Sequence, residues 1–262
     1  MSKLRIVVIT QNDDRLIPNN IRLLSEVIDV EILAVLEVTG GAAMRNKAIL
    51  FLKGFGFVQF IKLFLKRLFS ELLNFLDAFS NYRLRLFRSI KSAAHSIDAK
   101  YLKIRDPNQF EVLEKLRQRR VDLIVSFSAP CIFHDELLNI PTLGCVNLHC
   151  SLLPKHAGVM PSFWALYRRD RKLGITIHLM DDKIDNGAVI SQESIRSLND
   201  PTIYDVITET KDLGGRAMVR VVTEIARSGR IETITTQRPE VHNTWPSLEH
   251  IRKFAAEGGR LI

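Results

Sequence analysis

Short runs of β-branched and other apolar residues recur along the chain, with amphipathic helical segments between them. Most of these runs are too short for a helix and have the composition of strands buried on both faces. Six are predicted as strands, at residues 4–10, 30–38, 121–128, 144–149, 174–180 and 188–195. Strands that alternate with single helical crossovers form a mostly parallel sheet. The pattern therefore predicts an α/β fold, a Rossmann-like three-layer sandwich.

The length of 262 residues leaves room for one large domain with an appendage. We expect residues 1–200 to form the main domain and residues 201–262 to pack against it as a short C-terminal extension. That extension begins with a long helical pattern, which we expect to be interrupted at the glycine pair 214–215. Its last helix is predicted to have Ser247 as the N-cap.

A basic, phenylalanine-rich block at residues 46–99 interrupts the alternation of strands and helices. Residues 45–100 hold eleven Lys and Arg against three acidic residues, a difference equal to the net charge of +8 of the whole chain. From residue 58 to 79 the apolar positions are spaced as on a helix, at 61, 64, 65, 68, 69, 72, 73 and 76. We interpret the block as a helical insertion whose apolar stripe packs on the body of the protein. A helix at a membrane surface or a tRNA-binding surface would have a similar composition.

The stretch most similar to a membrane span is residues 48–65. Lys53 and Lys62 reduce its uncharged part to residues 54–61, whereas a bilayer needs about 20 predominantly apolar residues. We therefore expect no span and a cytoplasmic protein. The positive net charge makes an anionic partner plausible. We expect a small molecule and no DNA, and a homodimer remains open.

The three cysteines are Cys131, Cys145 and Cys150. An odd number without framework spacing favours free thiols in a reducing compartment. A zinc site would use closely spaced pairs such as C-x-x-C or H-x-x-x-H, and neither pair occurs, although His134 and His149 lie nearby in sequence. We expect buried thiols and no metal.

Asn147, His149 and Ser151 stand at every second position, at the end of a predicted strand. Side chains with this spacing share one face of a strand, and ligands bind at the carboxyl ends of strands in open α/β sheets. An Asn amide can donate to a developing oxyanion, and a His can move a proton near neutral pH. Asp185, in the loop before the last predicted strand, could orient the imidazole. Equally, residues 185–187 could form only a tight turn.

Two segments together resemble the folate-dependent formyltransferases. The first, VNLHCSLLPKHAG, contains Asn147, His149 and a Ser-Leu-Leu-Pro turn, and the second, GITIHLMDDKIDNGAVI, contains Gly-x-Thr-x-His and an Asp-x-Gly loop at Asp185. The family includes glycinamide ribonucleotide, methionyl-tRNA and sugar N-formyltransferases and formyltetrahydrofolate hydrolase. Either segment alone would be a weak signal, but both at this separation are specific.

The resemblance implies a formyltransferase fold, catalytic roles for Asn147, His149 and Asp185, and N10-formyltetrahydrofolate as the cosubstrate that formylates a primary amine. It also implies two folate-binding loops. Their residues are Ala129, Pro130, Cys131, Ile132, Phe133, Asp181, Asp182, Lys183 and Ile184.

Departures from the family narrow the choice of amine. Residues 10–20 lack the Gly-Ser-Asn phosphate loop of the glycinamide ribonucleotide enzymes, and we expect the residues after the last strand to be too few for the RNA-binding barrel of the methionyl-tRNA enzymes. We therefore expect a small anionic acceptor such as a nucleotide-linked amino sugar. Its predicted contacts are Ser151, Lys155, Phe163 and Trp164. An RNA-directed formyltransferase and a non-catalytic folate-binding protein are the alternatives.

Overall fold

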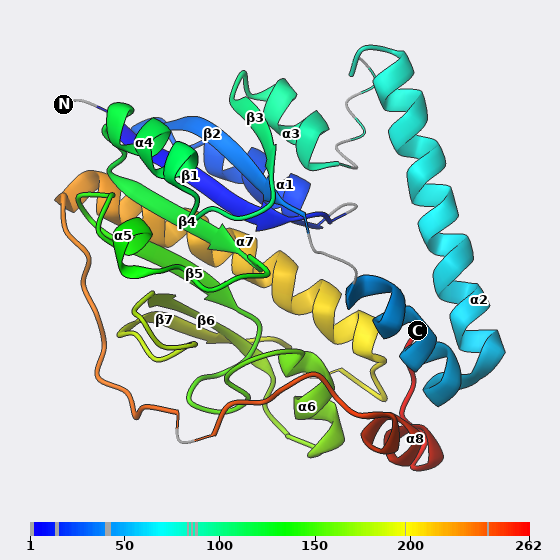
Figure 1. The fold of residues 1–262 in the computed structure, drawn as a ribbon. Helices are drawn as coiled ribbons and strands as arrows, with labels where there is room; N and C mark the ends of the chain where they lie inside the picture. The colour runs from blue at the N-terminus through cyan, green and yellow to red at the C-terminus, as the bar shows by residue number, and fades with distance from the viewer. Residues whose placement is uncertain are drawn as a thin grey trace.

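The structure is a computed structural model that describes residues 3–13, 16–39, 43–82, 84, 86, 89–196, 198–239 and 241–262. Its centre is a seven-stranded sheet with the order β3-β2-β1-β4-β5-β6-β7 (Figure 1). The strands are β1 (Leu4–Gln11), β2 (Val30–Val38), β3 (Lys100–Ile104), β4 (Leu123–Phe127), β5 (Cys145–His149), β6 (Gly174–Leu179) and β7 (Val189–Ser194). Neighbouring strands in the part of the sheet ordered β3-β2-β1-β4-β5 are parallel, whereas the pairs β5–β6 and β6–β7 are antiparallel. The predicted mostly parallel sheet is confirmed.

Helices cover both faces of the sheet because strand side chains alternate between two apolar clusters. Along β1, Ile6 and Val8 belong to one cluster, whereas Val7 and Ile9 belong to the other. The first cluster includes residues of α1 (Leu16–Ser25), α3 (Ile90–Ser96) and α7 (Ile203–Ser228), and the second includes residues of α4 (Phe110–Gln118) and α5 (Asp135–Leu138). The molecule is therefore the predicted three-layer α/β sandwich.

β3 is a strand that the sequence pattern did not indicate. It lies at the edge of the sheet beside β2, and its sequence, KYLKI, mixes lysine with apolar residues. α3 is the crossover from β2 to β3, and its Ile90, Ala93 and Ala94 are buried in the core. The predicted insertion at 46–99 therefore extends too far, because residues 90–99 belong to the α/β framework.

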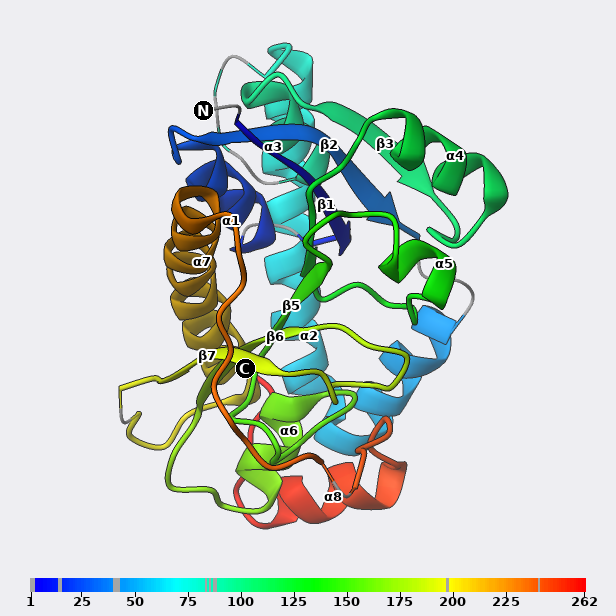
Figure 2. The same cartoon turned by 90° about the vertical axis from the view of Figure 1, so that its left-hand side faces the viewer.

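The inserted element is α2 (Ala43–Phe79), which is kinked at Gly56, where φ is 81° and ψ is 171°. It lies outside the three layers, at the end of the molecule toward which the parallel strands run (Figures 1 and 2). Before the kink, Gly54 approaches Ile251 of α8 (Leu248–Ala256), and the Phe55 ring lies 6.1 Å from the Phe254 ring. The helix is thus fastened to the body at its N-terminal part.

After the kink, the apolar stripe of α2 faces outward. The predicted stripe residues that are exposed are Phe64, Leu65, Leu68, Phe69, Leu72 and Leu76. The expectation that the stripe packs on the body of the protein is therefore wrong. Arg83, Arg85, Phe87 and Arg88 of the basic block lie outside the described residues.

Within the described part of the chain, one helical stretch, Ala48–Phe79, is long and apolar enough to cross a membrane, and none of its most apolar window is buried. The stretch is apolar enough even though it contains Lys53 and Lys62. Length and composition alone therefore admit a span here, and the expectation that the chain has none stays a prediction.

The C-terminal helices differ from the prediction at one point. Ser247 caps α8 as expected, because its side chain accepts a hydrogen bond from the His250 N–H. α7, however, is continuous across the glycine pair 214–215, and both glycines are buried. An added Cβ would overlap Leu148 of β5 at Gly214 and Asn20 of α1 at Gly215. The glycines therefore permit close packing and do not interrupt the helix.

Replacement of Gly215 by Ala tests this explanation. In an unpacked helix Ala is favoured over Gly by about 1 kcal/mol. Here the added methyl group overlaps Asn20, whose Nδ2 donates to the Lys211 carbonyl oxygen at 2.9 Å. We expect the free energy of unfolding in urea to fall by about 1–3 kcal/mol. The exposed neighbour change Arg216→Ala should stay within about 0.5 kcal/mol of wild type, and a more stable Gly215→Ala protein would contradict close packing.

Candidate active site

Adjacent strands bring polar side chains to one face of the sheet. In the strand register, Asn147 of β5 pairs with Ser126 of β4 on one side and with His178 of β6 on the other. Directly paired residues point to the same face, as do residues two apart on one strand. His149 therefore joins the row at the carboxyl end of β5. The alternation seen in the sequence becomes a set of convergent groups.

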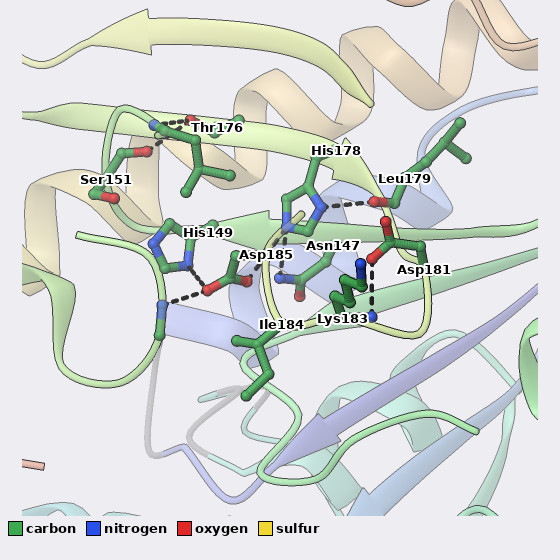
Figure 3. A network of polar contacts seen from close by, with 12 residues as sticks. Asn147, His149, Ser151, Thr176, His178, Leu179, Asp181, Lys183, Ile184 and Asp185 are labelled. Atoms are coloured by element: carbon green, nitrogen blue, oxygen red, sulfur yellow. Dashed lines mark hydrogen bonds and ion pairs between the residues drawn. The ribbon is translucent and has the colours of Figure 1, made fainter. Parts of the chain in front are cut away.

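Asp185 completes this row from the loop between β6 and β7 (Figure 3). Its Oδ2 lies 3.3 Å from His149 Nδ1, and its Oδ1 lies 3.5 Å from His178 Nε2. Oδ2 also accepts a hydrogen bond from the Gly158 N–H at 2.7 Å. One carboxylate thus joins β5, β6 and the turn that follows β5. This is the contact that the predicted trio of Asn147, His149 and Asp185 requires.

The loop that carries Asp185 depends on specific residue types. Asp185 has a φ of 50°, a region that aspartate tolerates better than most residues. Gly187 approaches the Leu179 carbonyl group so closely that a Cβ would overlap it. The tight-turn and catalytic readings of residues 185–187 are therefore compatible, because the turn places the carboxylate.

His178 belongs to the site although the predicted trio omits it. Its Nδ1–H donates to the Leu179 carbonyl oxygen at 2.7 Å, so Nε2 of the neutral ring accepts from Asn147 Nδ2 at 3.2 Å. This contact orients the Asn147 amide and leaves its second N–H for another acceptor. The Gly-x-Thr-x-His segment contains His178, but the cross-strand pairing with Asn147 is visible only in the fold.

Burial and neighbouring charges shift the pKa values of Asp185 and His149 in opposite directions. Burial raises the pKa of Asp185, but the neighbouring His149 and His178 rings and the hydrogen bond from the Gly158 N–H together outweigh it and lower the pKa to about 2. Burial lowers the pKa of His149, although Asp185 raises it. His149 Nε2 also lies 3.0 Å from the His156 carbonyl oxygen. Asp185 is thus ionised at neutral pH, and a proton gained by His149 finds an oxygen partner at each ring nitrogen.

The row forms one wall of a cleft of about 470 Å³, a size typical of small-molecule sites. Of the predicted folate-binding residues, eight line this cleft: Ala129, Pro130, Cys131, Ile132, Phe133, Asp181, Lys183 and Ile184. Asp182 is exposed and is not among the lining residues. The two predicted loops therefore face each other across one cavity.

The four predicted substrate contacts lie elsewhere. Ser151 Oγ donates to the Lys155 carbonyl oxygen at 2.8 Å and closes the turn after β5, and Lys155 is exposed near Asp170. Phe163 and Trp164, on α6 (Pro161–Tyr167), are buried in an apolar cluster, where the Trp164 Nε1–H donates to the Thr244 carbonyl oxygen at 3.0 Å. Their nearness to the motif in sequence was misleading, because the turn directs them away from the cleft.

Three residues that are distant from the motifs in sequence also line the cleft. Gln11 at the end of β1, Lys211 of α7 and Trp245 before α8 line the cleft. Lys211 forms an ion pair with Asp13 at 2.7 Å. Gln11 follows a predicted strand, which is a usable signal, whereas Lys211 and Trp245 carry no local motif.

The cysteines are poor candidates for chemistry. Burial raises the pKa of Cys131 to about 11 and that of Cys145 to about 12, so both thiols are protonated at neutral pH. Among the residues that the structure describes, no group of three or more His, Cys, Asp or Glu is arranged to hold a metal ion. The row on the wall of the cleft thus offers an amide, two imidazoles and a carboxylate beside the Ser126 hydroxyl.

The low pKa of Asp185 predicts a pH effect on stability. A carboxyl group with a lowered folded-state pKa stabilises the protein above its unfolded-state pKa and loses that effect as pH falls through the folded-state value. Relative to the ordinary value of 3.8, a pKa of about 2 corresponds to about 2 kcal/mol. Between pH 5 and roughly pH 2, wild type should therefore lose about 2 kcal/mol more than Asp185→Asn in urea unfolding. Parallel pH profiles for the two proteins would contradict the assigned contacts.

Known structures share this fold. A sugar N-formyltransferase from Shewanella sp FDAARGOS_354 has a TM-score of 0.58 at 14% identity, covering 92% of this chain and 76% of that one. Glycinamide ribonucleotide transformylase 1 from Symbiobacterium toebii has a TM-score of 0.60 at 16% identity, covering 89% of this chain and 95% of that one. At these identities the likeness concerns the fold alone.

Curated sequences give a more direct relationship. The methionyl-tRNA formyltransferase of Pelotomaculum thermopropionicum is 32% identical over 151 residues, which are 56% of this chain and 47% of the relative. The bifunctional polymyxin resistance protein ArnA of Wigglesworthia glossinidia brevipalpis is 40% identical over 106 residues, 40% of this chain and 16% of the relative. The chain thus spans less than half the length of these two relatives. A family model described as formyl transferase matches residues 81–222, more than half of the chain, and the chain therefore belongs to the formyl transferase family.

Proposed function

We propose that the protein transfers a formyl group from N10-formyltetrahydrofolate to a primary amine, in the cytoplasm. The observation that carries this proposal is the position of Asn147, His149 and Asp185 on one wall of the cleft, with Asp185 Oδ2 at 3.3 Å from His149 Nδ1. In a member of the formyl transferase family, these groups supply both an oxyanion donor and a proton acceptor.

The cleft fits a folate cosubstrate. Apolar side chains such as Ile132, Phe133 and Ile184 line it together with polar residues of both loops, as a pteridine ring with hydrogen-bonding edges would require. Ser126 Oγ is buried at the cleft and has no hydrogen-bond partner among the described residues. A buried hydroxyl of this kind is usually satisfied by a water or a ligand. The cosubstrate would supply an electrophilic formyl carbon and a nitrogen leaving group.

Asn147 would stabilise the charge that develops on the formyl oxygen. When the neutral amine attacks, a C–N bond forms and the carbonyl electron pair moves to that oxygen. The second N–H of Asn147 is oriented for this purpose because the first is held by His178. One such donor is typically worth about 3 kcal/mol in the transition state.

His149 and Asp185 would move the proton. The attacking amine becomes cationic and must lose a proton, and the folate nitrogen must gain one as its bond to the formyl carbon breaks. His149 is suited to this transfer because burial lowers its pKa and keeps the ring ready to accept. The Asp185 carboxylate would then stabilise the imidazolium. The net proton count is unchanged over the cycle.

We further propose a small anionic acceptor, such as a nucleotide-linked amino sugar. Asp13 Oδ1 accepts from the Leu16 and Ile17 N–H groups at the start of α1, at 2.8 and 3.1 Å, so the protein's own carboxylate takes amides that could otherwise bind a phosphate. This argues against a glycinamide ribonucleotide site there. With Phe163 and Trp164 buried, the aromatic surface proposed for the acceptor is Trp245, which lines the cleft.

A methionyl-tRNA acceptor is the second candidate, supported by the name and 32% identity of the relative described above. The basic block offers charge for RNA. Binding to tRNA should weaken steeply with salt, since each neutralised phosphate releases counterions. A small acceptor would show only a shallow dependence.

Variants of the row test the mechanism. Asp185→Asn, His149→Ala and Asn147→Ala should each lower turnover at least about 100-fold, because each removes charge stabilisation or proton transfer. Turnover is measured as tetrahydrofolate release, with circular dichroism to confirm folding. Asp182→Asn is the matched control, since Asp182 is in the same loop but exposed, and it should retain near wild-type turnover. Near wild-type turnover in Asp185→Asn or His149→Ala would refute the proposed roles.

An acceptor screen tests the substrate class. The protein is supplied with N10-formyltetrahydrofolate and either nucleotide-linked amino sugars or methionyl-tRNA, at increasing salt. We expect formylation of an amino sugar with KM changing less than about threefold between 50 and 200 mM salt, whereas a tRNA substrate would show a change of roughly a hundredfold or more. Folate binding without transfer to any amine would favour a non-catalytic folate-binding protein.

A further inference from the structure

The second part of α2, residues 57–79, has its polarity reversed relative to the body of the protein. Apolar residues recur at helical spacing along one side and are exposed, from Phe57 at 69% to Phe79 at 84%. The members of this outward stripe are Phe57, Val58, Phe64, Leu65, Leu68, Phe69, Leu72, Phe75, Leu76 and Phe79. Soluble monomers rarely expose a continuous apolar surface of this extent.

Polar residues of the same helix contact the body of the protein. Asp77 is 1% exposed, and its Oδ2 accepts from Ser92 Oγ of α3 at 2.6 Å. Near the other end, Gln59 Oε1 accepts from the Ile262 N–H at 3.2 Å. Between them, Lys66 Nζ lies 3.5 Å from the centre of the Tyr204 ring. These contacts fix the rotation of the helix, so the apolar stripe cannot turn inward without breaking them.

We propose that residues 57–79 of α2 lie in the surface of an anionic phospholipid bilayer, with the outward stripe inserted among the acyl chains. An amphipathic helix with exposed apolar residues on one side and basic residues beside them binds membrane surfaces in this way. Here Lys62 and Arg67 are exposed on the same segment as the stripe. The inward contacts hold the helix in this orientation before it meets lipid.

The charge beside the stripe favours lipid over a second copy of the chain. On residues 57–79, Lys62, Lys66 and Arg67 are all exposed, whereas one of the two acidic residues, Asp77, is buried. A symmetric dimer through the stripe would bring two such regions together, and like charges at an interface oppose association. An anionic leaflet attracts the same basic residues.

The packing favours a helix on the membrane surface over one that spans it. Lys62, Lys66, Arg67 and Glu71 occupy the middle of the segment, where a spanning helix would place them near the bilayer centre at high cost. Spanning would also strip Asp77 of its contact with Ser92. Lying in the surface instead buries the stripe and keeps both the charges and the inward contacts.

Vesicle flotation tests the proposal with the full chain. The vesicles are phosphatidylcholine alone or phosphatidylcholine with phosphatidylglycerol. The stripe variant carries the substitutions Leu68→Glu, Leu72→Glu and Phe75→Glu. A matched control makes the same charge change at exposed apolar residues elsewhere, with the substitutions Ile28→Glu, Phe110→Glu and Val241→Glu. Circular dichroism and thermal melting establish that both variants are folded, and the paired substitution Lys62→Glu and Arg67→Glu tests the charge separately without altering the stripe.

We expect wild type and the matched control to float with anionic vesicles, and the stripe variant to bind at least about tenfold more weakly. The charge-reversal variant should lose most of its preference for anionic over neutral vesicles. Equal flotation of the stripe variant and the control, or no flotation of wild type, would overturn the proposal. So would a stable dimer in analytical ultracentrifugation that the stripe variant abolishes, or wild type that resists alkaline extraction as a spanning protein does.

Discussion

The carboxylate of Asp185 is the contact on which the candidate site depends. It reaches His149 on β5, His178 on β6 and the Gly158 N–H in the turn after β5. Each of these segments is irregular or ends near the cleft, so the carboxylate supplies a shared partner that fixes them relative to one another. The orientation of the Asn147 amide follows through His178. A single charge thus organises the geometry on which formyl transfer would depend.

Sequence patterns predicted those parts of the fold that rest on local information. Buried strands such as β1 and β4 have short runs rich in β-branched and other apolar residues, and the family motifs indicated the separation of His149 and Asp185. β3 was not predicted because an edge strand carries polar residues. Phe163 and Trp164, predicted as substrate contacts, lie in another apolar cluster because of the path of the turn after β5. Lys211 and Trp245 reach the cleft only through tertiary packing.

α2 shows a different limit of pattern reading. Helical spacing of apolar residues predicts a helix with one apolar face, but the spacing does not say whether that face meets the protein or the surroundings. Here the hydrogen bonds of Asp77 and Gln59 hold the polar side of the helix against the protein and leave the apolar side exposed. α2, which carries the exposed apolar stripe, lies at the end toward which the parallel strands run (Figures 1 and 2), as does the row of polar side chains at the end of β5.

The fate of the formyl carbon tests the central claim most directly. N10-formyltetrahydrofolate labelled with ¹³C in the formyl group would be incubated with the protein and an amine acceptor, and the label followed by NMR. The account predicts that the label appears as a formamide on the acceptor nitrogen, in step with tetrahydrofolate release. Label that is released only as formate, or that stays on the folate with every acceptor, would contradict it.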